Sequence, residues 1–183
     1  MSSAASASRE QTAELVSGLL RDIPDFPEPG VLFKDITPLV ADGPALAQVC
    51  EALAAPYRDA GITTVVGLEA RGFIFGTAVA LALGAGFVPV RKAGKLPGAT
   101  VSLDYALEYG TARIEVHEDC VTPGERVLVV DDVLATGGTA AAAAELLEQV
   151  GAEVVAIEVV VELAALAGRS RLEGREVGAL LTV

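Results

Sequence analysis

The stretch RVLVVDDVLATGGTA, residues 126–140, combines residue types that can bind a sugar phosphate. A run of apolar residues typical of a buried strand ends in two adjacent carboxylates, Asp131 and Asp132, whose like charges repel. Two adjacent glycines, Gly137 and Gly138, then follow between threonines and interrupt the regular pattern. Adjacent like charges and adjacent glycines both disfavour a stable local structure, and such features are typical of functional sites. This stretch therefore indicates a ligand site.

The type of ligand follows from the position of the stretch after a strand. In an open parallel sheet, ligands bind beyond the carboxyl ends of the strands, and a helix that begins there presents free N–H groups to an anion. The glycines permit a close approach, and the hydroxyls of Thr136 and Thr139 can add hydrogen bonds. No lysine follows the glycines, so the stretch is not a Walker P-loop and favours a single phosphate. The two aspartates can accept hydrogen bonds from vicinal hydroxyls, which together with the phosphate predicts a ribose 5-phosphate. The alternative interpretation of this stretch is purely structural: an aspartate caps the helix that follows the strand, and the glycines permit close packing.

A second group of charged residues forms a basic segment in an acidic chain. The net charge is −12, yet residues 70–103 contain no Asp or Glu. They carry four basic residues: Arg71, Arg91, Lys92 and Lys95. A solvated basic loop is one interpretation. The other is a site for a second anionic group, with a glycine- and proline-containing loop that acts as a lid.

Alternating helices and strands must position these residues. Apolar periodicity predicts helices over 9–21, 44–60, 73–83 and 139–150, and strands over 63–68, 86–90, 126–130, 153–163 and 176–183. The proline-rich stretch that begins at residue 22 is an ordered connector, and residues 91–103 are a loop. Gly110 is the centre of a hairpin whose polar face carries Arg113, Glu115 and His117. This order predicts a single α/β domain over 1–183, with a parallel sheet flanked by helices.

Composition excludes several classes of protein. The acidic balance argues against general binding to nucleic acid or to an anionic membrane. Residues 72–90 are apolar enough to span a bilayer, but their glycines and Pro89 favour a helix followed by a strand. Cys50 and Cys120 lie far apart without a CxxC pattern, so we expect small buried hydrophobes in a reduced cytoplasm.

Further motifs accompany the sugar-phosphate stretch in a fixed order: DFPEPGVLFKDITPL, GLEARGFIFG, RKAGKLPG, YALEYGTARIEVHED and VVELAALAGR. Together they resemble the adenine phosphoribosyltransferases, a family of type I phosphoribosyltransferases, over residues 25–172. The resemblance implies the type I fold with a small N-terminal hood over residues 22–40 and a flexible hairpin or lid loop. It also implies a purine salvage enzyme that transfers the phosphoribosyl group of 5-phospho-α-D-ribose 1-diphosphate to adenine, giving AMP and pyrophosphate.

The resemblance assigns a role to each group of residues. It places the phosphoribose on Asp131, Asp132, Ala135, Thr136, Gly137, Gly138 and Thr139. It places the diphosphate on Arg71, Arg91, Lys92 and Lys95, and adenine on Leu32, Phe33 and Lys34. Glu108 is the catalytic residue that handles a proton of the base, although by itself it also fits an ordinary exposed strand acid. Mg²⁺ is held mainly by the diphosphate and water, and the chain is expected to form a homodimer.

Rival functions remain open at this point. Another purine phosphoribosyltransferase would use hypoxanthine or guanine with the same phosphoribose site, whereas the hood and the VELAALAGR segment favour adenine. A regulator that senses phosphoribosyl pyrophosphate would need an output domain, for which this chain has no room. A P-loop kinase lacks its lysine.

Overall fold

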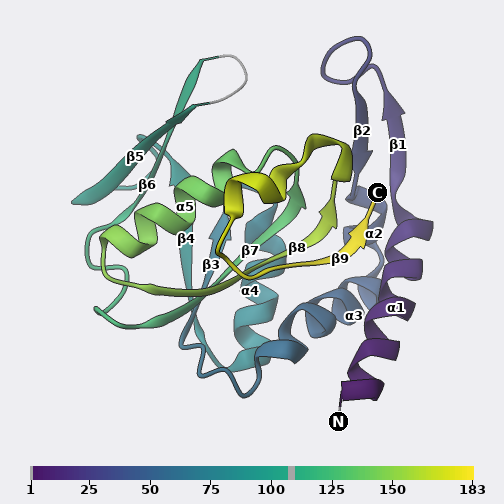
Figure 1. Ribbon diagram of the computed structural model, residues 1–183, viewed down its shortest axis with the longest axis horizontal. Coiled ribbons are helices and arrows are strands. Elements are labelled where there is room, and N and C mark those ends of the chain that lie inside the picture. Colours follow the sequence, from purple (N-terminus) through teal and green to yellow (C-terminus); the bar gives the residue numbers. More distant parts are fainter. Residues whose placement is uncertain (1, 107–109) are drawn as a thin grey trace.

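The fold is built around one seven-stranded sheet, described here from a computed structural model that covers residues 2–106 and 110–183. The strand order is β5-β6-β4-β3-β7-β8-β9 (Figure 1). The strands are β3 (Thr64–Leu68), β4 (Gly86–Lys92), β5 (Thr100–Ala106), β6 (Thr111–His117), β7 (Arg126–Leu134), β8 (Glu153–Glu162) and β9 (Val177–Thr182). A separate antiparallel pair comprises β1 (Arg21–Pro24) and β2 (Leu32–Asp35).

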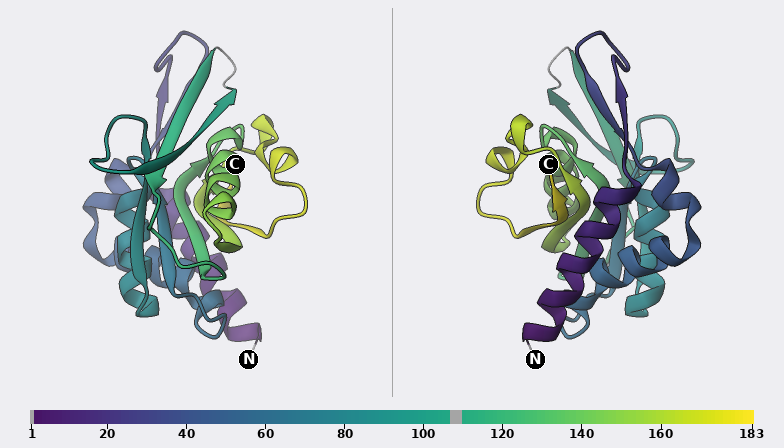
Figure 2. Two further views of the ribbon diagram at one scale, coloured as in Figure 1. Left: turned by 90° about the vertical axis from the view of Figure 1, so that its left-hand side faces the viewer. Right: turned by 90° about the vertical axis from the view of Figure 1, so that its right-hand side faces the viewer.

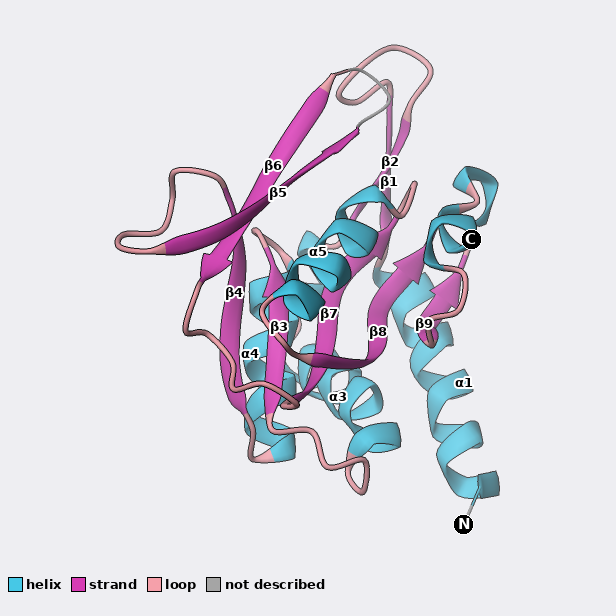
Figure 3. Cartoon of the chain, turned by 60° about the vertical axis from the view of Figure 1, so that its left-hand side comes forward, coloured by secondary structure: helices cyan, strands magenta, loops and turns pink. Residues whose placement is uncertain are grey.

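The sheet is mixed rather than wholly parallel. Neighbouring strands from β4 through β3, β7 and β8 to β9 run parallel, as predicted. Strand β6 is antiparallel to both β4 and β5, so the predicted hairpin extends the sheet at one edge. Figure 3 shows this hairpin and the β1–β2 pair projecting from the same end of the molecule.

Helices cover both faces of the sheet (Figure 2). The helices are α1 (Ser2–Leu19), α2 (Thr37–Ala41), α3 (Gly43–Ala54), α4 (Gly72–Leu83) and α5 (Gly138–Gln149), with short 3₁₀ turns η1 (Ala55–Tyr57), η2 (Ala164–Leu166) and η3 (Gly168–Leu172). Side chains along β7 alternate between the two sides: Leu128 and Val130 pack with α3 and α4, whereas Val127 and Val129 pack with α5. No helix in the described part of the chain is long and apolar enough to span a bilayer.

Several predicted boundaries are wrong; the strand predicted over 126–130, for example, continues to Leu134. Pairing between segments explains most of the larger errors. The first helix begins at residue 2 rather than 9, and the helix predicted over 44–60 ends at Ala54 in a 3₁₀ turn. The connector that follows residue 22 contains β1 and β2, which pair with each other. The loop predicted over 91–103 shrinks to 93–99, because β6 pairs with residues of β4 and β5 on either side of it. Both cysteines are free, but only Cys50 is buried as predicted, whereas Cys120 is half-buried; burial raises the pKa of the Cys50 thiol to about 11.

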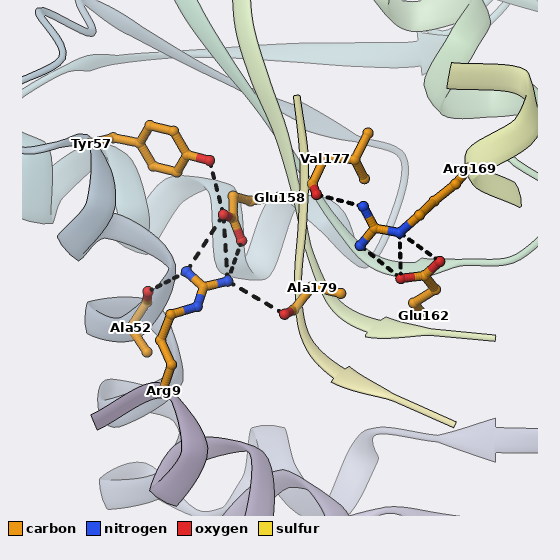
Figure 4. A network of polar contacts seen from close by, with 8 residues as sticks. All are labelled: Arg9, Ala52, Tyr57, Glu158, Glu162, Arg169, Val177 and Ala179. Carbon is orange, nitrogen blue, oxygen red and sulfur yellow. Dashed lines mark hydrogen bonds and ion pairs between the residues drawn. The ribbon is translucent and has the colours of Figure 1, made fainter. Parts of the chain in front are cut away.

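A buried carboxylate fastens the N-terminal helix to the sheet. Glu158 on β8 is 2% exposed, and burial raises its pKa. Arg9 on α1 approaches it to 3.0 Å, and the Tyr57 hydroxyl donates to it at 2.9 Å (Figure 4). Arg9 also donates to the carbonyl oxygens of Ala52 and Ala179. The buried charge is therefore paired and hydrogen-bonded, as a buried charge must be to be tolerated.

Candidate active site

The loop between β7 and α5 has a backbone that only glycine fits. Gly137 has a φ of +79°, and a Cβ atom there would lie 2.2 Å from the carbonyl oxygen of Gly168. Helix α5 begins at Gly138, so the first N–H groups of the helix have no partner inside it. We call residues 135–139 the phosphate loop. They line a small cavity of about 80 Å³ together with neighbours that include Asp131 and Val159.

A C-terminal segment packs closely against the phosphate loop. Gly168, at the start of η3, is packed so closely that a Cβ on it would lie 2.2 Å from the carbonyl oxygen of Ala135. The next residue, Arg169, donates two hydrogen bonds of 2.8 Å to Glu162 and one of 2.7 Å to the Val177 carbonyl (Figure 4). The VELAALAGR segment therefore positions the phosphate loop. Sequence reasoning used this segment only as part of a resemblance and missed its structural role.

Asp131 and Asp132 lie within β7, which continues past them to Leu134, and they have different partners. Asp132 is 3% exposed, and its Oδ2 lies 2.5 Å from Arg71 Nε as an ion pair that lacks the angles of a hydrogen bond. Asp131 is half-buried, lines the cavity at the phosphate loop, and accepts the Asp132 N–H at 2.9 Å. Burial and the neighbouring Asp132 raise the pKa of Asp131. Asp131 is thus the carboxylate that lines the cavity, whereas Asp132 pairs with Arg71.

Arg71 connects this end of the sheet to the predicted hood. Its guanidinium carbon lies 5.3 Å from the centre of the Phe33 ring, and Phe33 packs edge-on against Phe26 at 5.2 Å. The three predicted adenine-binding residues lie on one wall of a cavity of about 270 Å³, lined by Val31, Leu32, Phe33, Lys34, Arg71, Val133, Ala135, Leu163 and Leu166. The ammonium of Lys34 is paired with Asp22 at 2.7 Å.

The basic residues do not form one cluster. Arg91 and Lys92 line a third cavity, of about 420 Å³, together with Tyr105 and Thr139. Lys95 is absent from this lining, and its carbonyl oxygen accepts a hydrogen bond from Arg91 at 3.2 Å. The structure thus brings Arg91 and Lys92 to a cavity beside the phosphate loop and leaves Lys95 on the 93–99 loop.

Two acids that sequence reasoning missed organise this basic region. Glu69 pairs with Arg91 at 3.2 Å and accepts the N–H of Lys92 at 2.9 Å. Glu115, predicted on the exposed face of the hairpin, is instead 6% exposed and accepts the N–H groups of Lys95 and Leu96 at 2.8 Å. These hydrogen bonds lower the pKa of Glu115, so it remains ionised and fixes the 93–99 loop. Alternation along β6 placed Glu115 opposite Ile114 and Val116 as predicted, but the 93–99 loop covers that face and buries it.

Glu108, the predicted catalytic acid, lies outside the described residues. His117, predicted on the polar face of the hairpin, is the last residue of β6 and is half-buried. It pairs in register with Thr100 and does not line the three cavities described above.

Comparison with known proteins identifies the family. Residues 39–177 match the model of the phosphoribosyl transferase domain. The chain is 60% identical over 174 residues to the adenine phosphoribosyltransferase of Streptomyces coelicolor, covering 93% of this chain and 96% of that one. It is 61% identical over 160 residues to the enzyme of the same name from Streptomyces clavuligerus, with 87% and 90% covered.

Solved structures agree with the sequence comparison. The adenine phosphoribosyltransferase of Rhodothermus marinus superposes with a TM-score of 0.90 at 49% identity, covering 94% of this chain and 99% of the other. The Saccharomyces cerevisiae enzyme, crystallised with adenine and an imino-altritol bisphosphate, gives a TM-score of 0.87 at 43% identity, with 96% and 99% covered. Both are type I phosphoribosyltransferase folds, like the mixed sheet and hood described above. The chain belongs to the adenine phosphoribosyltransferase family of phosphoribosyltransferases.

Proposed function

We propose that the protein is a purine salvage enzyme that transfers the 5-phosphoribosyl group from phosphoribosyl pyrophosphate to adenine, yielding AMP and pyrophosphate. One observation supports this proposal more than any other: the three cavities are neighbours that share lining residues. Val133 and Ala135 line both the hood cavity and the phosphate-loop cavity. Thr139 lines both the phosphate-loop cavity and the basic cavity. A base, a ribose 5-phosphate and a diphosphate require neighbouring sites in this arrangement.

The phosphate loop is suited to the 5′-phosphate. The free N–H groups at the start of α5, the helix dipole and the threonine hydroxyls all favour an anion there. Asp131, beside the loop, accepts hydrogen bonds from the ribose hydroxyls. Ala135, Thr136, Gly137, Gly138 and Thr139 contribute the loop itself.

The basic cavity is suited to the diphosphate leaving group. Displacement of pyrophosphate from the anomeric carbon passes through an oxocarbenium-like transition state, in which negative charge develops on the leaving group. Arg91 and Lys92 line that cavity and stabilise this charge. Arg71 follows β3, the strand between β4 and β7, and its pairing with Asp132 fixes its position. Lys95 contacts the diphosphate only if the 93–99 loop shifts.

The hood is suited to a flat aromatic base. Leu32 offers its backbone and Phe33 its ring at the wall of the hood cavity. Lys34 contributes its aliphatic stem, since its ammonium is held by Asp22. Glu108 handles the proton of the base by acid–base catalysis.

Members of the phosphoribosyltransferase family generally use Mg²⁺ with phosphoribosyl pyrophosphate. No three His, Cys, Asp or Glu side chains in the described ranges converge on one point. The donor set therefore fits a Mg²⁺ bound through diphosphate oxygens and water better than one in a protein cage. When bound, the ion neutralises charge on the leaving group. The homodimer and the cytoplasmic location remain predictions.

The direct test is product formation from three bases in parallel. Purified protein receives phosphoribosyl pyrophosphate, Mg²⁺ and either adenine, hypoxanthine or guanine, and nucleotides are separated by chromatography. We expect AMP from adenine alone, a loss of at least about 100-fold in kcat/KM for Asp131→Asn, and near-normal activity for the exposed Asp119→Asn. IMP or GMP as the main product would contradict adenine specificity. Binding of phosphoribosyl pyrophosphate without any product would favour a sensor.

A further inference from the structure

A hydrogen bond between side chains joins the hairpin to the start of helix α5. The Tyr105 hydroxyl, near the end of β5, lies 3.1 Å from Oγ1 of Thr139, the second residue of α5. Both residues line the basic cavity, and Thr139 also belongs to the phosphate loop. The Tyr105 hydroxyl of the hairpin therefore contacts the phosphate loop and can influence the orientation of the Thr139 hydroxyl towards a bound anion.

The aromatic ring of Tyr105 is held independently of its hydroxyl. Val101, Leu103 and Tyr105 alternate along β5 and pack against the core on the α5 side of the sheet. A Cβ built on Gly138 would lie 3.7 Å from the Tyr105 ring, so the ring packs against the first turn of α5. Phenylalanine at this position would keep those apolar contacts and lose only the hydroxyl.

The chemistry of a phosphate decides which hydroxyl donates. Either hydroxyl can donate in the hydrogen bond between Tyr105 and Thr139. A phosphate dianion presents only acceptors, and Thr139 has a single hydroxyl proton to give it. Once that proton points to a phosphate, Thr139 Oγ1 can only accept from its other neighbour. The Tyr105 hydroxyl must then be the donor.

We infer that Tyr105 is a positioning residue for the 5′-phosphate of the substrate. Its hydroxyl selects the Thr139 rotamer in which Oγ1 faces the cavity and directs the threonine proton to the phosphate. Without this bond, Thr139 samples other staggered rotamers and forms the phosphate contact less often. The inference rests on the proposed function, because it assumes that the phosphate binds at the phosphate loop.

The test compares the binding of two anions to Tyr105→Phe and to the wild type. We expect calorimetry to show about a three- to tenfold higher Kd for ribose 5-phosphate, the loss of one hydrogen bond. The Kd for pyrophosphate, which reports the basic cavity, should not change. Asp104→Asn is the matched control. Asp104 precedes Tyr105 on the outer face of the hairpin, where it pairs with Arg113 at 2.6 Å. This variant loosens the same hairpin and should bind ribose 5-phosphate as the wild type does.

A double-mutant cycle separates positioning from general packing. Thr139→Val removes the hydroxyl that Tyr105 is inferred to orient, so the double variant Tyr105→Phe/Thr139→Val should bind no more weakly than Thr139→Val alone. In turnover, Tyr105→Phe should raise KM for phosphoribosyl pyrophosphate and leave kcat and KM for adenine unchanged, as expected for lost uniform binding.

Three outcomes would overturn the inference. The first is an unchanged Kd for ribose 5-phosphate in Tyr105→Phe. The second is a double variant whose increase in Kd equals the product of the increases in Tyr105→Phe and Thr139→Val, and the third is a higher Kd for pyrophosphate in place of ribose 5-phosphate. A wild-type protein that binds ribose 5-phosphate but forms no nucleotide would refute the proposed function, while the calorimetric comparison would still decide the role of Tyr105. Failure of the wild type to bind ribose 5-phosphate would overturn both.

Discussion

The pairing of Arg71 with Asp132 predicts a large loss of stability when the arginine is removed. The Asp132 side chain is 5% exposed and lies 2.5 Å from Arg71 Nε, whereas the Arg71 side chain is 43% exposed. Removing one partner of a fully buried pair costs about 3–5 kcal/mol, because an uncompensated charge stays in the interior. Since Arg71 is partly solvated, we expect Arg71→Met to lower the free energy of unfolding by about 2–3 kcal/mol. Loss of the contact with Phe33 contributes about 0.5 kcal/mol of this.

The assay is urea unfolding at neutral pH, with an exposed ion pair as control. Arg113 pairs with Asp104 at 2.6 Å, but the two side chains are 55% and 59% exposed. Arg113→Met should therefore cost less than about 1 kcal/mol. The double variant Arg71→Met/Asp132→Asn should recover about 1–2 kcal/mol of the loss in Arg71→Met, because it removes the stranded charge. Equal losses in Arg71→Met and Arg113→Met would refute the reasoning.

Three further predictions test other parts of the account. Gly137→Ala should lower the free energy of unfolding by about 2 kcal/mol or more and weaken ribose 5-phosphate binding. The φ of residue 137 is +79°, and the added Cβ would meet a backbone oxygen at 2.2 Å. An unchanged melting temperature would contradict this. Glu115→Gln should raise the pyrophosphate Kd about three- to tenfold by weakening charge-assisted bonds to the 93–99 loop, without affecting adenine binding; equal weakening of both ligands would point to global damage. Hydrogen bonds from Thr37 and the Arg21 guanidinium lower the pKa of Asp35 to about 2. The stabilisation by the Asp35 carboxylate is therefore complete above its ordinary pKa and is lost as the pH falls towards about 2. In Asp35→Asn, the free energy of unfolding in urea should fall less steeply with decreasing pH on the acid side. An unchanged slope would refute the assignment.

The phosphate loop is the part of the site that the sequence predicted best. Its features are local: an apolar strand, two acids and a glycine turn all lie within fifteen residues, and the fold keeps this order, although the strand continues past the acids to Leu134. The helices and parallel strands around it were also predicted, because apolar periodicity depends on which face of each element is buried. What the sequence did not reveal was that Gly168 packs beneath this loop, since that contact joins segments far apart in the chain.

The basic region was predicted less well for a physical reason. Counting charges along residues 70–103 indicated a basic segment without acidic residues. The fold brings Glu69 and Glu115, which lie outside that segment, against it: Glu69 pairs with Arg91, and Glu115 holds the 93–99 loop. Glu115 lies on β6 and appeared to be on the solvent side of an alternating strand. Its burial depends on a loop that crosses the strand, and strand periodicity carries no information about such a crossing.

The most direct test of the central claim is a crystal structure of the protein with AMP. The account predicts that the 5′-phosphate lies about 3 Å from the N–H groups of residues 136–139, with the ribose hydroxyls on Asp131 and the adenine ring against Phe33. It would be contradicted if the phosphate of AMP lay between Arg91 and Lys92, or if the base lay outside the hood cavity.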